Sequence, residues 1–319
     1  MGTDGAAVFL TDALVRRQVD VTHLARVPGP SGTALVFLDP TTKENRIVII
    51  GGANTYRNDD CGLLWANDRI WSDAYPEKEE GEKETTALFR VLQSARVVLL
   101  QCEVPEVVNI RAAQVASSHG VPVLLDLGGG DRPLSDDLLR LVTTLSPNET
   151  ELNRLIDPEE DLLDMDPTHR HEYAAARFLL RGAGEPGHRL RHILLKRGIH
   201  GTTLLELIDP KEDRTPPPPQ NGGCGVSYGG VGDKEEIRGE KDGYVVVVRH
   251  RQESIPAEFV VDTTGAGDAY TAGYAVGVAE GRDVREAMRL GAKVASLVVS
   301  RVGAMSSLPT RGEVDAYDA

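Results

Sequence analysis

The stretch ARVVLLQCEVPEVVNIRAAQVASSHGVPVLLDL, residues 95–127, contains the alternation that decides the fold. It opens with a short apolar run that includes β-branched residues, continues with apolar residues at helical spacing as far as Gly120, and ends in a second apolar run. This pattern predicts a strand, a helix and a second strand. A right-handed helical crossover then places the two strands parallel in one sheet.

The same alternation continues to residue 198. The segments TTLSP and RHILLKRG predict further strands, and LSDDLLRLV, NETELNRLI and HEYAAARFLLRGAG predict the helices between them. Ser135 stands directly before the first of these helices, with two acids behind it, as an N-cap residue does. We therefore expect an α/β fold with a mostly parallel sheet that is covered by helices on both faces.

The N-terminal part has a different order of elements. After a helix near Asp4–Gln18, strand-like pieces follow one another at residues 19–27, 31–39 and 45–54. Strands in succession predict a small antiparallel sheet beside the main one, as in a lid.

Two segments have the composition of insertions. Residues 57–84 are polar and end in the acidic run PEKEEGEKE, which predicts a solvated segment. Residues 209–242 contain PPPP and many glycines, which predicts a loosely ordered or disordered segment.

The composition excludes several classes of partner. The 319 residues are 40% hydrophobic and have a formal net charge of −14, so a broad basic face for nucleic acid or for an anionic membrane is not expected. The three cysteines, Cys61, Cys102 and Cys224, are far apart and form neither a disulfide framework nor a zinc pattern. The chain contains no run of 18 apolar residues, so we expect a cytoplasmic protein without a membrane span.

A glycine-rich loop precedes a helical pattern in VVDTTGAGDAYTAGY, residues 260–274. The glycines permit close approach of a ligand, and the amides of Gly265 to Asp268 lie where a helix N-terminus binds anions. A carboxylate beside an anion hole suits phosphoryl transfer, with Asp268 taking the proton of the attacking hydroxyl. Alternatively, Asp268 is only a capping acid, worth about 1 kcal/mol.

The segment DTTGAGDAYTAGY closely resembles the C-terminal signature of the ribokinase family, the PfkB-type carbohydrate kinases. Other blocks resemble the family in the same order along the chain: SGTALVFLD with ENRIVIIGGAN, QCEVP, SPNETE, LLKRGIHG and SRVGAMSSLP. The lid blocks are more similar to ribokinase than to fructokinases or adenosine kinases. The resemblance implies one three-layer α/β/α domain over residues 1–319 with a partial β lid at 19–54. It also implies ATP-dependent phosphorylation of a sugar hydroxyl, converting D-ribose to D-ribose 5-phosphate.

The resemblance further implies roles for single residues. Asp268 matches the catalytic base, Glu103 a residue that hydrogen-bonds the sugar, and Glu151 a carboxylate that organises Mg²⁺ and phosphate, through water. The anion hole matches Gly265, Ala266 and Gly267. The ATP site matches Asn148, Lys196, Arg197, Gly198, Ile199, His200, Gly201, Gly267, Asp268 and Ala292. An activating K⁺ site matches Asp262, Thr264, Val298, Arg301, Gly303 and Ser307. A homodimer through the lid strands is also compatible with the family.

The chain departs from the family pattern at its start. The family opens with a strand that carries a sugar-binding aspartate, followed by a Gly-Gly-Lys-Gly-x-Asn block, and neither is found in this sequence. The favoured interpretation is a sequence that lacks the N-terminal part of the domain, because the chemistry at the phosphate end is intact. The alternatives are a non-catalytic nucleotide-binding homologue, or a kinase for another sugar or a nucleoside.

Overall fold

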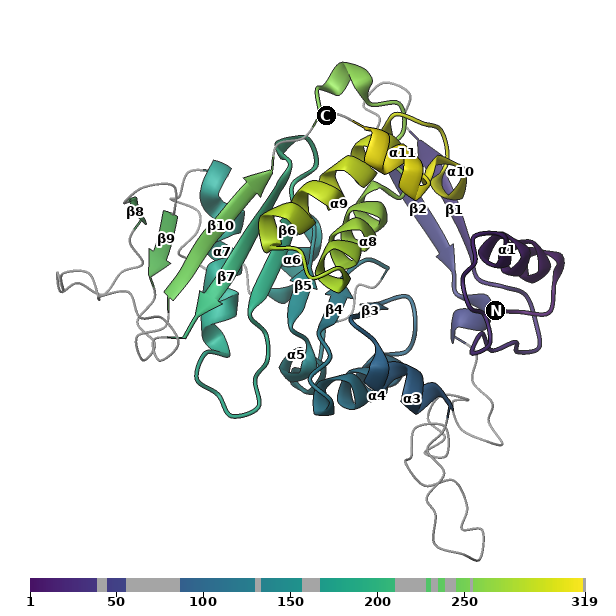
Figure 1. The fold of residues 1–319 in the computed structure, drawn as a ribbon, viewed down its shortest axis with the longest axis horizontal. Helices are drawn as coiled ribbons and strands as arrows, with labels where there is room; N and C mark the ends of the chain where they lie inside the picture. The colour runs from purple at the N-terminus through teal and green to yellow at the C-terminus, as the bar shows by residue number, and fades with distance from the viewer. Residues whose placement is uncertain are drawn as a thin grey trace, which may run out of the picture. The chain divides into compact units, whose positions relative to one another are not determined.

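The computed structural model describes residues 1–38, 45–55, 87–129, 133–156, 167–209, 228–230, 235–238, 245–252 and 255–317. These residues form two compact units (Figure 1). Unit 1 contains Met1–Ala95 and Cys102–Val121, and unit 2 contains Arg96–Gln101 and Pro122–Ala319.

Unit 1 contains the elements of the N-terminal part, α1 (Gly5–Arg16), β1 (Thr33–Leu38), β2 (Asn45–Ile50), η1 (Gly52–Thr55), α3 (Ala87–Ser94) and α4 (Glu106–Ser118). The predicted first helix is confirmed, and Asp4 is its N-cap residue, accepting a hydrogen bond from the amide of Ala7 at 2.9 Å. The predicted antiparallel pairing is also confirmed, because β1 and β2 pair with Thr33 opposite Ile50.

The strand predicted at residues 19–27 is wrong. In the structure this segment contains one turn, at Thr22 and His23, and no strand. The carboxylate of Asp20 accepts hydrogen bonds from both the amide of Thr22, at 2.9 Å, and its hydroxyl, at 2.5 Å. Such local side-chain bonds to the backbone compete with strand pairing, and they outweigh the apolar alternation that suggested a strand.

Unit 2 is built on an eight-stranded sheet with the order β3-β4-β5-β6-β7-β10-β9-β8. The strands β3 to β6 are parallel, as the alternation of strands and helices predicts, whereas β7, β10, β9 and β8 continue the sheet in antiparallel pairs. The strands span Val98–Gln101, Val123–Asp126, Thr144–Ser146, His192–Lys196, Thr202–Ile208, Tyr228–Gly230, Glu235–Arg238 and Val245–Gln252, for β3 to β10 in order.

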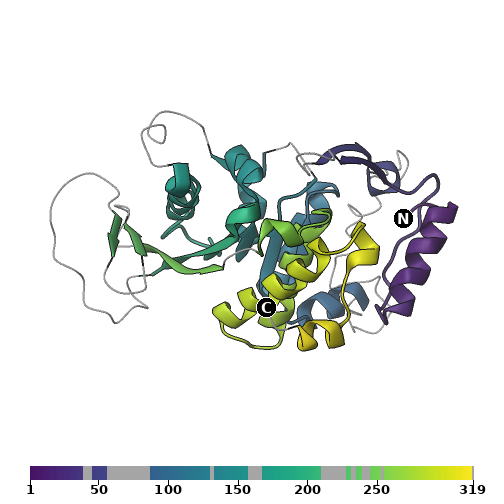
Figure 2. The same cartoon turned by 90° about the horizontal axis from the view of Figure 1, so that it is seen from above.

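Helices cover both faces of this sheet. The α-helices of unit 2 are α5 (Asp136–Leu141), α6 (Glu149–Leu155), α7 (Pro167–Arg181), α8 (Ala266–Ala279), α9 (Val284–Val299), α10 (Ala304–Ser307) and α11 (Arg311–Ala316), of which the last two pack against α9. Figure 2 shows α7 on one side of the sheet and the yellow-green pair α8 and α9 on the other. Successive residues of β7 point to opposite faces of the sheet. Leu204 belongs to a core cluster with Tyr270 of α8 and Met288 of α9, whereas its neighbour Thr203 bonds Glu172 of α7. The three-layer α/β/α arrangement is therefore confirmed.

The two segments interpreted as insertions differ in what the structure describes. Residues 57–84 lie outside the described residues. Within 209–242, which was predicted to be loosely ordered, the described residues form the short strands β8 and β9. Pairing with β10 explains this difference, because β9 satisfies its backbone donors and acceptors along residues Val245–Val248 of that strand.

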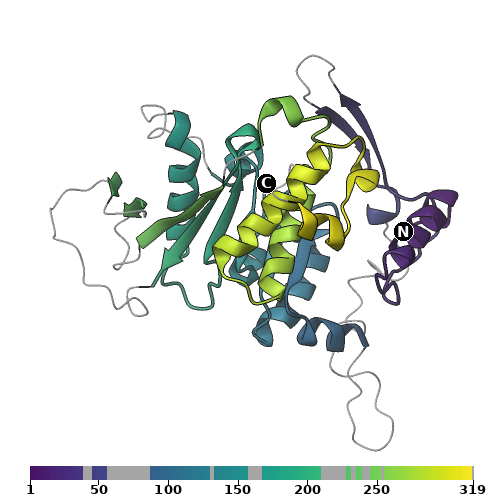
Figure 3. The ribbon, with the colours of Figure 1, turned by 45° about the horizontal axis from the view of Figure 1, so that its top comes forward.

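The helices α8 and α9 pack at unusually close range, side by side across the sheet (Figure 3). A Cβ added at Gly277 would stand 2.6 Å from the Cα of Ala287, and one added at Gly273 would stand 2.8 Å from the Cα of Gly291. Glycine at these positions lets the two backbones approach. This contact fixes the direction of α8, whose N-terminus lies in the loop with the glycines.

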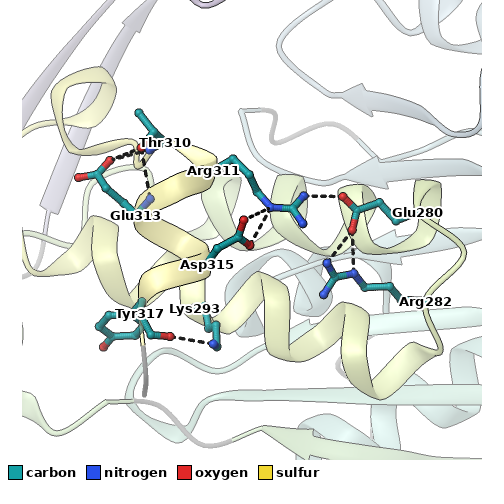
Figure 4. A network of polar contacts seen from close by, with 8 residues as sticks. All are labelled: Glu280, Arg282, Lys293, Thr310, Arg311, Glu313, Asp315 and Tyr317. Carbon is teal, nitrogen blue, oxygen red and sulfur yellow. Dashed lines mark hydrogen bonds and ion pairs between the residues drawn. The ribbon is translucent and has the colours of Figure 1, made fainter.

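A network of polar contacts attaches the C-terminal helix α11 to this pair (Figure 4). Arg311 bonds Glu280 at the end of α8 and also Asp315 within α11, and Glu280 accepts a further bond from Arg282. At the other end of α11, Lys293 donates to the carbonyl of Tyr317 at 2.7 Å. The network therefore ties α11 to α8 and α9, over a small cluster formed by Leu290, Leu297 and Val314.

None of the helices in the described part of the chain combines the length and the apolar character needed to cross a membrane.

Candidate active site

Three neighbouring parallel strands end in polar residues at one edge of the sheet of unit 2. The last residues of β4, β5 and β6 are Asp126, Ser146 and Lys196. A buried apolar run precedes Asp126 and Lys196, and the buried residues Thr144 and Leu145 precede Ser146. Asp126 pairs with Ser146 in the register, and an isolated bridge joins Asn148 to Lys196, whose amide donates to the carbonyl of Pro147 at 2.8 Å. The carboxyl edge of parallel strands is where open α/β sheets bind ligands.

An ion pair joins the ends of β4 and β6. The Nζ atom of Lys196 lies 2.7 Å from Oδ2 of Asp126, and the two side chains are 13% and 4% exposed. Thr271 of α8 donates its hydroxyl to the same carboxylate oxygen at 2.6 Å and lies 2.9 Å from the hydroxyl of Ser146. The other oxygen, Oδ1, accepts the amide of Gly128 at 3.2 Å. The carboxylate of Asp126 is thus fixed by the strand ends and by α8 together.

The N-terminus of α8 lies beside this ion pair. Gly265, its N-cap residue, has a φ of 77°, a left-handed conformation that favours glycine. The amide of Ala266 donates to the carbonyl of Thr263 at 3.2 Å, whereas the described residues offer no partner to the amides of Gly265, Gly267 and Asp268. Unpaired amides at a helix N-terminus can bind an anion, and the anion hole expected at Gly265, Ala266 and Gly267 stays a prediction.

Lys196 lies close to Gly267 in this turn of helix. A Cβ placed on Gly267 would stand 3.5 Å from the Nζ atom of Lys196. An ammonium group therefore lies beside the turn that carries the three unpaired amides, and such a combination can bind a phosphate.

Asp268 and Glu151 complete the group of charges. The Asp268 side chain is exposed, yet surrounding protein atoms raise the pKa of its carboxyl by desolvation. Asp126 raises this pKa further and Lys196 lowers it. Because the carboxyl still faces water, screening limits the shift. Burial is also the main cause that raises the pKa of Glu151, which hydrogen bonding from the backbone of Asn148 and the charge of Lys196 partly oppose.

Asn148 and Glu151 bond to each other in a capping box at the start of α6. The amide of Glu151 donates to Oδ1 of Asn148 at 2.8 Å, and both Glu151 oxygens accept bonds from Asn148, at 2.8 and 2.9 Å. The bonds hold the buried carboxylate in place and occupy one acceptor site on each of its oxygens.

In the turn at residues 196–201 the arginine side chain is directed into the protein, not toward solvent. The side chain of Arg197 points inward, bonding Glu172 at 3.0 Å, and Glu172 also accepts the hydroxyl of Thr203 at 2.7 Å. Gly198 and Gly201 have φ values of 50° and 74°, as this tight turn requires. Ile199 and His200 are exposed. Arg197 therefore anchors the turn to α7, and a nucleotide here would meet the turn's backbone and exposed side chains.

The residues predicted for a monovalent cation also come together in unit 2. Both oxygens of Asp262 accept amide bonds at 2.9 Å, from Thr264 and from Gly303. These bonds lower the pKa of the Asp262 carboxyl. Arg301 donates to the carbonyl of Ser307 at 3.4 Å and to Glu313 at 2.7 Å. The amide of Arg301 bonds the carbonyl of Val298 at 3.1 Å.

Two predicted residues do not belong to this group. Glu103 belongs to unit 1, whereas Asp268 belongs to unit 2. Ala292 lies on α9 and packs against the cluster that contains Leu124, Leu194 and Tyr270. Among the described residues, no three His, Cys, Asp or Glu side chains gather as a metal site would require.

Sequence reasoning missed Asp126, Ser146 and Thr271. A signal for the first was present, because Asp126 ends the apolar run VLLD and a charged residue at the end of a buried parallel strand is a ligand candidate. No comparable signal marked Thr271, which lies within a helix and becomes part of the site only because α8 crosses the strand ends.

A cavity of about 320 Å³ lies elsewhere in unit 2, lined by residues of α5, α6 and α7 that include Arg140, Arg154 and Arg181. It contains none of the residues at the strand ends or at the N-terminus of α8. The site is therefore located by the converging charges and amides, not by this cavity.

Comparison with known proteins identifies the family. The sequence profile of the pfkB family carbohydrate kinases matches residues 1–220 and 238–311, and this chain belongs to that family. A ribokinase from Arabidopsis thaliana is 32% identical over 287 residues, covering 89% of this chain. One from Bacillus subtilis is 28% identical over 285 residues, covering 89% of this chain and 68% of that protein.

A solved structure supports the same fold. The structure of Arabidopsis thaliana ribokinase complexed with ribose and ATP has a TM-score of 0.64 and 30% identity, covering 98% of this chain and 78% of that one. The chain spans 56% of the full length of the Arabidopsis sequence relative.

Replacing Glu172 with Ala should lower the free energy of unfolding by about 3–5 kcal/mol, because it leaves the guanidinium of Arg197 buried without its main partner. Chemical denaturation measures this change. The matched control is Glu185→Ala, which removes an exposed partner of Arg140 and should cost less than about 1 kcal/mol. Equal losses in the two variants would contradict an anchoring role for the Arg197–Glu172 pair.

Proposed function

We propose that this chain is an ATP-dependent sugar kinase that transfers the γ-phosphoryl group of ATP to the 5-hydroxyl of D-ribose. One observation carries the proposal: a carboxylate, Asp268, follows unpaired helix amides directly and lies within electrostatic reach of Lys196. Membership of the pfkB family supports the reaction class, and the ribokinase relatives support ribose as the acceptor.

In the proposed reaction the carboxylate of Asp268 takes the proton of the sugar hydroxyl. The oxygen then forms a bond to the γ-phosphorus while the bond from that phosphorus to the β–γ bridging oxygen breaks, leaving ADP. The amides of Gly265, Gly267 and Asp268 stabilise the charge on the transferring group, since they are already oriented and need no rearrangement. The raised pKa of Asp268 suits a group that must accept a proton during the reaction.

The residues present fit a magnesium ion. Glu151 offers a buried carboxylate whose oxygens each keep acceptor capacity beside the capping bonds, which suits contact through water. Mg²⁺ bound with ATP would neutralise charge on the phosphates. Glu151 itself is held rigidly by Asn148, so its position does not depend on the ion.

The choice of ribose as the acceptor follows the named relatives. Glu103, the residue expected to bond the sugar, lies in unit 1, and the relatives that carry the argument are ribokinases. Fructose, a deoxysugar and a nucleoside are the alternative acceptors, and a nucleotide-binding protein without kinase activity is the alternative from another class. A cytoplasmic location fits both the use of ATP and the scattered cysteines.

Asp268→Asn should reduce ribose-dependent ADP release by about 10²–10⁴-fold, because it removes the proton acceptor. The affinity for ATP, measured by calorimetry, should change less than about threefold. The parent chain is assayed in parallel with ribose, 2-deoxyribose, fructose and adenosine. Near-normal turnover in the variant would contradict the assignment of the base. ATP binding without release of ADP for any acceptor in the panel would favour the non-catalytic alternative.

We further propose that a monovalent cation activates the enzyme through the segment around Asp262. The segment can offer backbone carbonyls and one carboxylate, which are the oxygen ligands that such a cation prefers, and the amide bonds from Thr264 and Gly303 hold that carboxylate rigidly. Activity in K⁺ should exceed that in Na⁺ at equal ionic strength. Equal rates in the two salts would contradict this proposal without affecting the assignment of Asp268.

The lid strands of unit 1 supply the proposed homodimer contact. Apolar side chains on β1 and β2 are exposed on successive residues, including Phe37 at 61% and Ile49 at 55%, and exposed apolar edge strands tend to pair with another chain. Sedimentation should show a dimer that Phe37→Glu converts to a monomer. The matched control is Phe9→Glu on α1, a phenylalanine of similar exposure (66%) whose replacement should leave the dimer intact. A monomeric parent chain would exclude the contact.

A further inference from the structure

The Lys196 ammonium is held between two fixed structures. On one side it bonds the Asp126 carboxylate at 2.7 Å, and on the other it lies beside Gly267 in the first turn of α8. Its backbone is held as well, because an isolated β-bridge joins Lys196, the last residue of β6, to Asn148. A lysine side chain normally samples many rotamers, and here that freedom is removed before any ligand arrives.

Asp126 is in turn held by groups that do not belong to β4. Thr271 of α8 donates to its Oδ2 atom and Gly128 to its Oδ1 atom. Lys196 has three N–H donors, and the described residues provide a partner for one of them. The remaining two are available on the side of the unpaired amides of Gly267 and Asp268, where further acceptors would be the oxygens of an anion.

Burying an ion pair of this kind costs desolvation free energy, so stability alone does not account for its presence. Replacing a nearly buried pair by apolar residues is often neutral or stabilising, so packing alone gives little reason for a lysine and an aspartate here. The pair joins two strand ends next to the proposed base rather than two surfaces that need to be held together.

We propose that Lys196 is a catalytic residue that contacts the γ-phosphoryl group of ATP, and that Asp126 is the positioning residue that holds its ammonium there. The proposal rests on the phosphoryl-transfer function proposed above and adds the source of positive charge within the protein. Lys196 donates hydrogen bonds to the phosphoryl oxygens as negative charge is redistributed in the transition state, and it neither gains nor loses a proton overall. Asp126 makes no contact with substrate.

The same charges act on Asp268, and this gives a second readout. The groups that face Asp268 are Asp126 from β4, whose charge raises its pKa, and Lys196 from β6, whose charge lowers it. Glu151 of α6 lies near the same two residues. Because the base must be deprotonated, kcat/KM falls as the pH drops below its pKa. Removing the charge of Lys196 should move this limb to higher pH, and removing that of Asp126 should move it to lower pH.

The test compares three variants of the full chain. Lys196→Met should lower kcat by about 10²–10³-fold with little change in the KM for sugar, and Lys196→Arg should recover part of the loss. The double variant Asp126→Asn with Lys196→Met contains no unpaired buried charge, so it should fold as stably as the parent chain in thermal unfolding. It should nevertheless be as slow as Lys196→Met. The control is Arg140→Met, which removes a positive charge away from the site and should keep its activity. The backbone carbonyl of Arg140 accepts the amide of Arg189, which lies before the start of β6.

Binding measurements decide the proposal even if the chain turns over no sugar. In calorimetry, Lys196→Met should weaken the binding of a non-hydrolysable ATP analogue at least about tenfold more than the binding of ADP. Recovery of kcat in the double variant would show that the pair is structural and overturn the proposal. Equal losses of affinity for the analogue and for ADP would also overturn it, because the contact would then not involve the γ-phosphoryl group. If the parent chain releases no ADP with any sugar, but Lys196→Met still loses affinity for the ATP analogue more than for ADP, only the proposed reaction is contradicted.

Discussion

The bond between Lys196 and Asp126 is the interaction on which the site depends. It connects the ends of β4 and β6 across the end of β5, and Thr271 attaches the same carboxylate to α8. The carboxylate of Asp126 therefore connects the sheet to α8, the helix whose N-terminus provides the unpaired amides. If either connection were lost, the ammonium of Lys196 would no longer be fixed relative to the first turn of α8, which carries the amides and Asp268.

The electrostatics of this region are a balance between desolvation and charge. Desolvation raises the pKa of both Asp268 and Glu151, and Asp126 adds to this effect. Lys196 opposes it at both carboxyl groups. The charge of one ammonium thus opposes, at Asp268 and at Glu151, the effect of the neighbouring Asp126 carboxylate.

Contacts remote from the strand ends hold α8 and the turn after Lys196 in place against their neighbouring helices. Close contact at Gly273 and Gly277 sets α8 against α9, and the polar network around Arg311 attaches α11 to both helices. On the opposite face, Arg197 and Glu172 anchor the turn that follows Lys196 to α7. The sheet is therefore supported on both sides next to its carboxyl edge, which limits the movement of the residues that end there.

The sequence by itself determined the local elements of the parallel half, the antiparallel pair β1 and β2, and the loop at Gly265 to Asp268, because strand, helix and turn signals act over a few residues. It also supplied the resemblance that named the family. It failed at residues 19–27, where side-chain bonds to the backbone replaced a strand, and it did not predict the antiparallel strands beyond β6. Only the tertiary structure paired Asp126 with Lys196 and brought Thr271 to them. These residues are 70 and 145 positions from Asp126 along the chain, and their meeting depends on strand order and helix packing, which no local pattern encodes.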